Sequence, residues 1–233
     1  MPSQPDAATA PDAVELADDP WTAEIRLSEV VYHGAVWDIR RDRFDYGDGE
    51  IVREYVDHTG AVAVLACDEQ DRVLLIKQYR HPIGARDWEI PAGLLDEDGE
   101  PPLSAAQREL AEEADLAATR WDLLTEFFSS PGGSNEAIRV YLARGLSPTA
   151  TFGRSAEEAD IETRWVDLDT AVGAVLERRC ANAILANAVL AAAASRARGW
   201  SSLGDAGAPW PRHPKSQRRM NEPRNDEPRK NER

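Results

Sequence analysis

The sequence predicts an α/β protein in which helices cover a mixed sheet as a sandwich, preceded by a small antiparallel sheet at the N-terminus. Segments with the alternating apolar pattern of strands lie on both sides of one acidic helix, and two more helical segments follow near the C-terminus. The 233 residues are 42% hydrophobic, which is enough for the core of one domain with a small extension.

The N-terminal region, residues 23–58, alternates like strands and contains the turn sequence YGDGE, so we expect a separate antiparallel sheet there. Residues 61–67 and 72–80 are apolar segments on either side of a polar turn, which predicts a β-hairpin. The segment WEIPAG is expected to be short and extended, because Pro91 and Gly93 interrupt it.

The acidic helix is predicted over about residues 105–115, within a main domain of residues 59–200. Ser104 followed by Gln107 matches a capping box, in which two side chains satisfy free N–H groups at a helix start. Two strands and two helices are expected beyond it, and the last helix ends at Gly199. The strands are 137–146 and 162–168, and the helices are 169–178 and 182–198.

The net charge of −15 is unevenly distributed. Residues 1–24 carry six acids and no base, whereas residues 212–233 carry eight bases and four acids. Both ends lack apolar periodicity, so we expect residues 1–22 to be a disordered acidic tail and residues 201–233 a disordered basic tail. The overall acidity argues against a nucleic-acid-binding protein.

The two cysteines, Cys67 and Cys180, lie in apolar segments and are expected to be reduced, as is typical of a cytoplasmic protein. The N-terminus is acidic rather than basic, unlike a signal peptide. The longest apolar run, ANAILANAVLAAAA, is too short to span a bilayer. We therefore expect no membrane partner.

Three glutamates of the acidic helix share one face. Glu109, Glu112 and Glu113 are spaced i, i+3 and i+4, and like charges at that spacing cost about 0.2–0.5 kcal/mol a pair. A compensating cation would relieve the repulsion, and Mg²⁺ or Mn²⁺ prefers carboxylate oxygens. A solvated acidic face is the alternative, and these three residues alone do not exclude it.

The pattern G…E-x7-R-E-L-x-E-E-x-x-L resembles the Nudix box, the loop–helix–loop motif of Nudix hydrolases. Six residues rather than the usual five separate the glycine from the first glutamate, and loops tolerate such a change. Asp115 stands where the family has glycine, and aspartate adopts the left-handed conformation more readily than most residues. The matching residues are Gly93, Glu100, Arg108, Glu109, Leu110, Glu112, Glu113 and Leu116.

The resemblance implies metal-assisted hydrolysis of a nucleoside diphosphate linked to another group, with Mg²⁺ or Mn²⁺ offsetting charge on the pyrophosphate and activating a water. The implied metal ligands are the carbonyl of Ala92 and the side chains of Glu109 and Glu113. Glu112 would share a second ion. Arg108 would orient a neighbouring glutamate through a charge-assisted bond, with a surface ion pair as the alternative.

The general base is expected outside this helix, because bound cations depress the pKa of their carboxylate ligands. The acidic segment 153–165 lies between two predicted strands. The ADP-ribose pyrophosphatase branch of the family, which the chain resembles, carries its catalytic glutamate at this point. The resemblance therefore implies Glu158, with Glu157 as the alternative, and a solvated acidic loop is the competing interpretation.

Similarity to that branch covers about residues 23–198 and includes the sequences REYVDH, QYRHPIGARDWEIPAGLL and FFSSPGGSNEAIRVYLARGL. It implies a homodimer whose N-terminal strands reach the partner's site. Trp37 would stack on adenine, Arg80 would contact the phosphates or the base, and the loop SSPGGSNE would line the terminal ribose. The implied substrate residues are Trp37, Asp38, Arg53, Glu54, Arg80, Leu94, Ser130, Gly132 and Glu136.

These residues also have ordinary structural interpretations. Trp37 fits strand packing, Arg53 and Glu54 fit a surface pair, and PGG fits a plain turn. The alternative substrates are a nucleotide sugar such as GDP-mannose or a diadenosine polyphosphate. A catalytically inactive ADP-ribose-binding module is a further alternative, but such a module does not need the four box glutamates and Arg108 that this chain retains.

Overall fold

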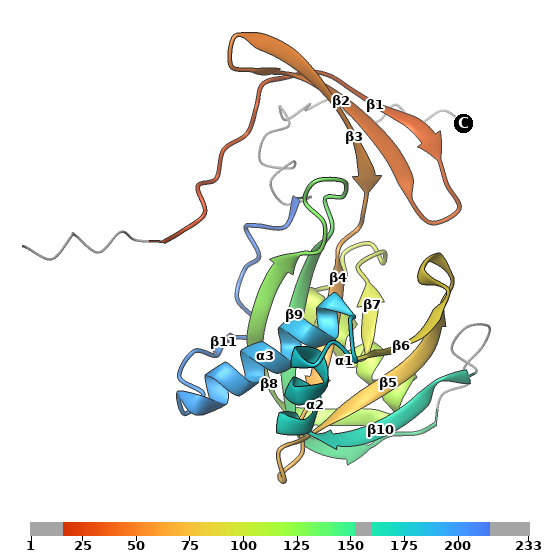
Figure 1. Ribbon diagram of the computed structural model, residues 1–233, viewed down its shortest axis with the longest axis vertical. Coiled ribbons are helices and arrows are strands. Elements are labelled where there is room, and N and C mark those ends of the chain that lie inside the picture. Colours follow the sequence, from red (N-terminus) through yellow and green to blue (C-terminus); the bar gives the residue numbers. More distant parts are fainter. Residues whose placement is uncertain (1–15, 152–159, 215–233) are drawn as a thin grey trace, which may run out of the picture.

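The computed structural model of the protein describes residues 16–151 and 160–214. Its N-terminal part is a three-stranded antiparallel sheet, drawn in orange at the top of Figure 1. The turn between its last two strands contains Gly47, whose φ of 59° is in the left-handed region that glycine adopts without strain. The sheet predicted for residues 23–58 is therefore confirmed. Its strands are β1 (Ile25–His33), β2 (Asp38–Tyr46) and β3 (Gly49–Asp57).

The core is a five-stranded mixed sheet in the order β11-β8-β9-β4-β7, in which β4 and β9 run parallel and the other neighbours antiparallel. Its strands are β4 (Ala61–Ala66), β7 (Ala92–Leu94), β8 (Leu116–Phe128), β9 (Ala137–Pro148) and β11 (Gly204–Asp205). Helix α1 (Pro102–Ala114) covers one face and α3 (Ala183–Ala197) the other. Side chains alternate across a strand, so Val64 of β4 packs with α1 and Leu65 packs with α3. The predicted α/β/α sandwich is confirmed.

A second antiparallel sheet, in the order β10-β5-β6, lies beside this core (Figure 1). Its elements are β5 (Arg72–Arg80), the 3-10 helix η1 (His81–Ile83), β6 (Ala85–Glu89) and β10 (Glu162–Asp167), which leads into α2 (Leu168–Leu176). The predicted hairpin of residues 61–67 and 72–80 is reduced to one antiparallel bridge between Cys67 and Val73, because β4 pairs with β9 and β7 while β5 pairs with β10 and β6. Every residue of β4 is buried, so this strand occupies the middle of a sheet.

Helix α1 begins earlier than predicted. Pro101 is its N-cap and Pro102 its first residue, so the capping box assigned to Ser104 is wrong. Proline suits a helix start because the N–H that it lacks has no partner there. Strand β8 was not predicted, because Asp115 ends α1 and the strand starts at the next residue without a loop. None of the helices in the two described ranges is both long and apolar enough to cross a bilayer.

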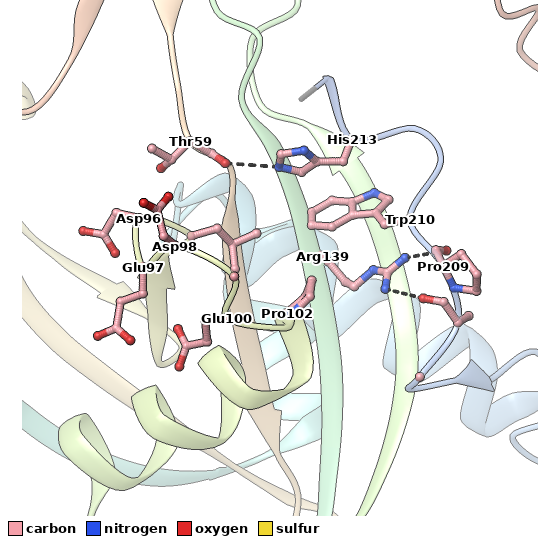
Figure 2. Close-up of a pocket in the computed structure, with 14 residues that line it drawn as sticks. Thr59, Asp96, Glu97, Asp98, Glu100, Pro102, Arg139, Pro209, Trp210 and His213 are labelled. Carbon is pink, nitrogen blue, oxygen red and sulfur yellow. Dashed lines mark hydrogen bonds between the residues drawn. The ribbon is translucent and has the colours of Figure 1, made fainter. Parts of the chain in front are cut away.

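The beginning of the C-terminal tail differs from the disorder expected for residues 201–233. Residues 204–213, here termed the C-terminal strap, start with β11 and bury Trp210 and His213. Figure 2 shows that the buried Arg139 of β9 donates to two carbonyls of the strap, and its guanidinium lies 4.7 Å from the Trp210 ring. The strap thus supplies acceptors to a buried cation. The carbonyls are those of Ala208, at 2.8 Å, and Pro209, at 3.1 Å.

Candidate active site

The acidic face of α1 carries an ion-pair cluster centred on Arg108. Its guanidinium donates from Nε and Nη2 to the two carboxylate oxygens of Glu100, at 3.2 and 3.0 Å. Nη1 donates to Glu109 at 2.6 Å and to Glu112 at 3.2 Å. The hydrogen bonds with Glu100 raise the pKa of Arg108 above its usual value, although burial opposes the shift. The expected charge-assisted contact is present, and Arg108 supplies a compensating cation to the clustered glutamates.

A second set of contacts joins α1 to β7. The backbone N–H of Ala92 donates to Oε2 of the buried Glu113 at 2.9 Å. A Cβ at Gly93 would collide with the carboxyl group of Glu109, so the absence of a side chain lets Glu109 approach the β7 backbone. Leu94, the last residue of the strand, is half-buried. Gly93 of β7 and two box glutamates therefore meet at the junction of β7 and α1.

The end of α1 confirms the expectation for Asp115. Its φ of 54° and ψ of 36° are left-handed, and its N–H donates to the carbonyls of Leu110 and Ala111. Aspartate thus ends the helix in the conformation that glycine usually adopts at this position.

The donor atoms at this junction suit a hard divalent cation. Glu109, Glu112 and Glu113 supply carboxylate oxygens, and β7 supplies backbone carbonyls. In the side-chain arrangement of the described residues, no group of three potential ligands converges on one point. Arg108 holds Glu109 and Glu112, so a cation would compete with the guanidinium for these carboxylates.

Arg80, at the end of β5, is held by Glu89 of β6. The guanidinium donates from Nε and Nη2 to the two oxygens of Glu89, at 2.7 and 2.6 Å. Gln78 donates to the same buried carboxylate at 3.3 Å. Arg80 is therefore oriented by a two-point contact while its side chain stays partly exposed. The sequence argument missed Glu89, although an acidic residue within the apolar segment WEIPAG is a signal.

Three predicted substrate residues make their described contacts within the N-terminal sheet. Asp38 lies 3.2 Å from Nδ1 of His33, and Glu54 pairs with Arg41 at 2.7 Å. Arg53 donates to the carbonyl of the preceding residue at 2.8 Å. Arg53 and Glu54 do not form the surface pair considered above, because adjacent residues of a strand point to opposite faces.

Trp37, before β2, stacks on His58, with ring centroids 4.1 Å apart and an interplanar angle of 21°. Nε2 of His58 lies 3.2 Å from Oε1 of Glu136, so the structure places the predicted adenine platform beside the loop predicted to bind ribose. Ser130 and Gly132 are exposed on this loop, and the Ser130 carbonyl accepts two N–H groups that close a turn. The sequence argument missed His58.

Comparison with known proteins identifies the family. Residues 57–185 match the NUDIX domain family. The ADP-ribose pyrophosphatase of Mycobacterium tuberculosis is 43% identical over 165 residues, which are 70% of this chain and 80% of that protein. This chain belongs to the Nudix family. The ADP-ribose pyrophosphatase of Bacillus subtilis is 36% identical over 162 residues, 69% of this chain and 87% of that protein.

Other similarities place this Nudix chain near enzymes with different substrates. The GDP-mannose pyrophosphatase of an Enterobacter species is 31% identical over 137 residues, 54% of this chain and 70% of that protein. A crystal structure of an ADP compounds hydrolase superposes with a TM-score of 0.65 at 21% identity, covering 78% of this chain and 99% of that one. At this identity the structure supports the Nudix fold alone. Glu158 and Glu157, the candidates for the base, lie outside the described residues.

Proposed function

We propose that this Nudix protein hydrolyses ADP-ribose at its pyrophosphate, giving AMP and ribose 5-phosphate, with Mg²⁺ or Mn²⁺ as cofactor. The observation that carries the proposal is the junction of β7 and α1, where Arg108 gathers three glutamates and Glu113 meets the N–H of Ala92. The two ADP-ribose pyrophosphatases at 43% and 36% identity support the choice of substrate.

The box residues divide into cation ligands and a residue that aligns them. When bound, a divalent cation would offset the charge that develops on the pyrophosphate oxygens. Glu109, Glu112, Glu113 and the Ala92 carbonyl would hold it. The N–H of Ala92 already orients one oxygen of Glu113. Arg108 offsets part of the negative charge of the glutamates that it contacts and orients their carboxylates.

Arg80 would bind the substrate's phosphates. Glu89 fixes its guanidinium by two hydrogen bonds, so the cation loses little further freedom when an anion binds. Trp37 would stack on adenine through its ring face. The remaining residues proposed to line the substrate are Asp38, Arg53, Glu54, Leu94, Ser130, Gly132 and Glu136.

The general base is assigned to Glu158, because carboxylates that hold a cation are poor bases. Glu158→Gln should keep a near-normal KM for ADP-ribose and lose about 10²–10⁴ in kcat, the usual contribution of a general base. Steady-state kinetics of Glu158→Gln and the matched Glu157→Gln measure this. Loss of turnover in Glu157→Gln alone would identify Glu157 as the general base. Wild-type turnover in both variants would show that the general base lies outside this segment.

We also propose a homodimer in which the N-terminal sheet contributes to the partner's site. Within residues 25–57 of the single chain no apolar side chain is buried. A small sheet without a core of its own needs a further surface to cover it. Its large exposed side chains are Ile25, Leu27, Val31, Tyr32, Val36, Tyr46 and Val52.

Light scattering after size-exclusion chromatography tests the dimer on the full chain. The double variant Leu27→Lys/Val31→Lys should elute as a monomer, because two charges on β1 would have to be desolvated at the interface. Ser147→Lys, an exposed position of β9, is the control and should leave the dimer intact. A monomeric wild type, or a double variant that stays dimeric, contradicts the proposal.

The activity is tested by measuring kcat/KM for ADP-ribose, GDP-mannose and diadenosine polyphosphates, each with Mg²⁺ and with Mn²⁺. We expect ADP-ribose to be preferred. Glu109→Gln and Glu113→Gln should each lower kcat by orders of magnitude while the chain stays folded. The control is Glu97→Gln, an exposed residue whose carboxylate lies 4.0 Å from the Arg108 guanidinium.

Two results would change the assignment. A preference for GDP-mannose, the substrate named for the 31% identical relative, would replace ADP-ribose and keep the reaction class. Binding of ADP-ribose without hydrolysis under either metal would show an inactive binding module.

A further inference from the structure

We propose that His58 is a positioning residue for base recognition: it fixes the Trp37 ring, so that the nucleobase stacks on the face of Trp37 turned away from His58. The inference rests on the proposed function, in which Trp37 is the base platform. His58 contributes no atom to the reaction. It would act mainly on affinity for the adenosine half of the substrate and less on the ribose 5-phosphate half, because Ser129 also holds the Glu136 carboxylate that His58 contacts.

His58 is fixed on several sides. It is 7% exposed, and its backbone N–H donates to Oδ1 of Asn135 at 2.7 Å. Its Nδ1 accepts the N–H of Gly60 at 2.9 Å, and its Nε2 lies 3.2 Å from Oε1 of Glu136. A buried ring whose Nδ1 accepts a hydrogen bond and whose Nε2 lies beside a carboxylate cannot leave without breaking these contacts. The stack with Trp37 therefore belongs to a rigid part of the molecule.

The hydrogen bonds also determine where the proton of the neutral imidazole lies. Nδ1 accepts from a backbone amide, so Nε2 of the neutral ring carries the hydrogen, 3.2 Å from Oε1 of Glu136. The amide bond at Nδ1 and the carboxylate beside Nε2 together hold the ring where it stacks on Trp37. Glu136 acts on Trp37 through His58, which connects the loop that contains residues 129–136 to the base platform.

The same loop is anchored to the N-terminal sheet. The N–H of Val56 donates to the carbonyl of Gly133 at 3.0 Å, and Nδ2 of Asn135 donates to Asp57 at 2.8 Å. Asp57 also accepts from Arg40 of β2 at 2.8 Å. His58 follows directly after β3, so the sheet that carries Trp37 and the loop that carries Glu136 meet at this residue.

These contacts decide which face of Trp37 serves a base. His58 covers one face at a centroid distance of 4.1 Å, which is ordinary stacking distance and leaves no space for a second ring between them. A base entering on that side would have to displace a buried, hydrogen-bonded histidine. A base on the opposite face completes a three-layer stack of base, indole and imidazole, with the indole already held in place.

Three variants of the full chain test the inference: His58→Ala, His58→Phe and His213→Ala. Phenylalanine keeps a stacking ring and loses the polar contacts. His213 is the matched control, because it is buried to a similar extent beside Gly60, with Nε2 3.1 Å from the carbonyl of Thr59, and it contacts Trp210 instead of Trp37. For each protein, urea denaturation gives stability, kinetics give KM and kcat for ADP-ribose, and calorimetry gives the Kd of AMP and of ribose 5-phosphate.

We expect His58→Ala to raise the KM for ADP-ribose and the Kd of AMP about three- to tenfold, the usual worth of an aromatic pair, with kcat unchanged and a smaller change in the Kd of ribose 5-phosphate. His58→Phe should recover only part of the AMP affinity, because the stacking ring stays but the contacts that fix its angle are lost. His213→Ala should lose stability comparably and bind AMP like the wild type. Unchanged AMP binding in His58→Ala, or equal losses of AMP affinity in the His58 and His213 variants, overturns the proposal.

The two proposals fail separately. A wild type that binds AMP but leaves ADP-ribose intact refutes the proposed activity, and the AMP titrations still decide the role of His58. A wild type that binds no AMP overturns the role of His58 directly.

Discussion

Replacing Arg108 by methionine tests whether the Nudix-box helix depends on an internal cation in the absence of metal. The guanidinium makes four hydrogen bonds, of 2.6 to 3.2 Å, to the carboxylates of Glu100, Glu109 and Glu112. Methionine keeps most of the apolar stem of the arginine side chain, so the stability lost by the substitution is mainly electrostatic. Glu109 and Glu112 would then repel each other on one face of α1, and Glu100 of the preceding loop would lose the same counter-charge.

The size of the expected stability loss follows from how deeply these charged side chains are buried. Removing one partner of a fully buried ion pair costs about 3–5 kcal/mol. Arg108 is 27% exposed and Glu112 is 41% exposed, so solvent screens part of the charge. We therefore expect Arg108→Met to lower the free energy of unfolding by about 2–3 kcal/mol. Arg108→Lys should lower the free energy of unfolding by about half as much, because an ammonium group cannot form the two-point contact with Glu100.

Urea denaturation in EDTA at low ionic strength is the assay, with equal m-values as the check that the transitions are comparable. Added Mg²⁺ should reduce the difference in unfolding free energy between Arg108→Met and the wild type, because a bound cation supplies the positive charge that the variant lacks. Arg120→Met is the control, an exposed arginine that pairs with Asp122 at 3.3 Å, and it should lose less than about 1 kcal/mol. Equal stability of Arg108→Met and the wild type in EDTA would refute the reasoning.

Three further predictions concern other parts of the structure. Gly93→Ala should lower kcat/KM about 10²-fold with little loss of stability, because the new Cβ displaces the carboxylate of Glu109; kinetics and denaturation measured together check this. Deleting residues 204–233 should lower the unfolding free energy by about 3 kcal/mol or more, as expected for losing a buried tryptophan, whereas deleting residues 215–233 should leave the urea midpoint unchanged. Burial raises the pKa of Cys67 to about 11, so about one thiol in a thousand is ionised at pH 8, and iodoacetamide should label Cys67 only when urea unfolds the chain.

The parts of the fold that sequence patterning predicted are those with a local signal. The alternation of residues 23–58 predicted the N-terminal sheet, and the i, i+3, i+4 spacing of glutamates predicted the acidic face of α1. The resemblance to the Nudix box marked Asp115 as the end of the helix, which the left-handed backbone confirms.

The errors arose where distant contacts decide the structure. Adjacent strands such as β4 and β5 joined different sheets, because β4 pairs along both edges with β9 and β7 while α1 and α3 cover its two faces. The C-terminal strap has no apolar periodicity, and its position depends on the buried Arg139 of a distant strand. His58 contacts Glu136, which is far away in the sequence, so its own surroundings in the chain gave little indication of it.

The most direct test of the central claim is the product analysis of ADP-ribose incubated with the purified full-length chain. With Mg²⁺ or Mn²⁺, the account predicts equimolar AMP and ribose 5-phosphate by chromatography, no product in excess EDTA, and at least a 10²-fold lower rate for Glu113→Gln. Intact ADP-ribose with either metal, or an undiminished rate in EDTA or in Glu113→Gln, would contradict it.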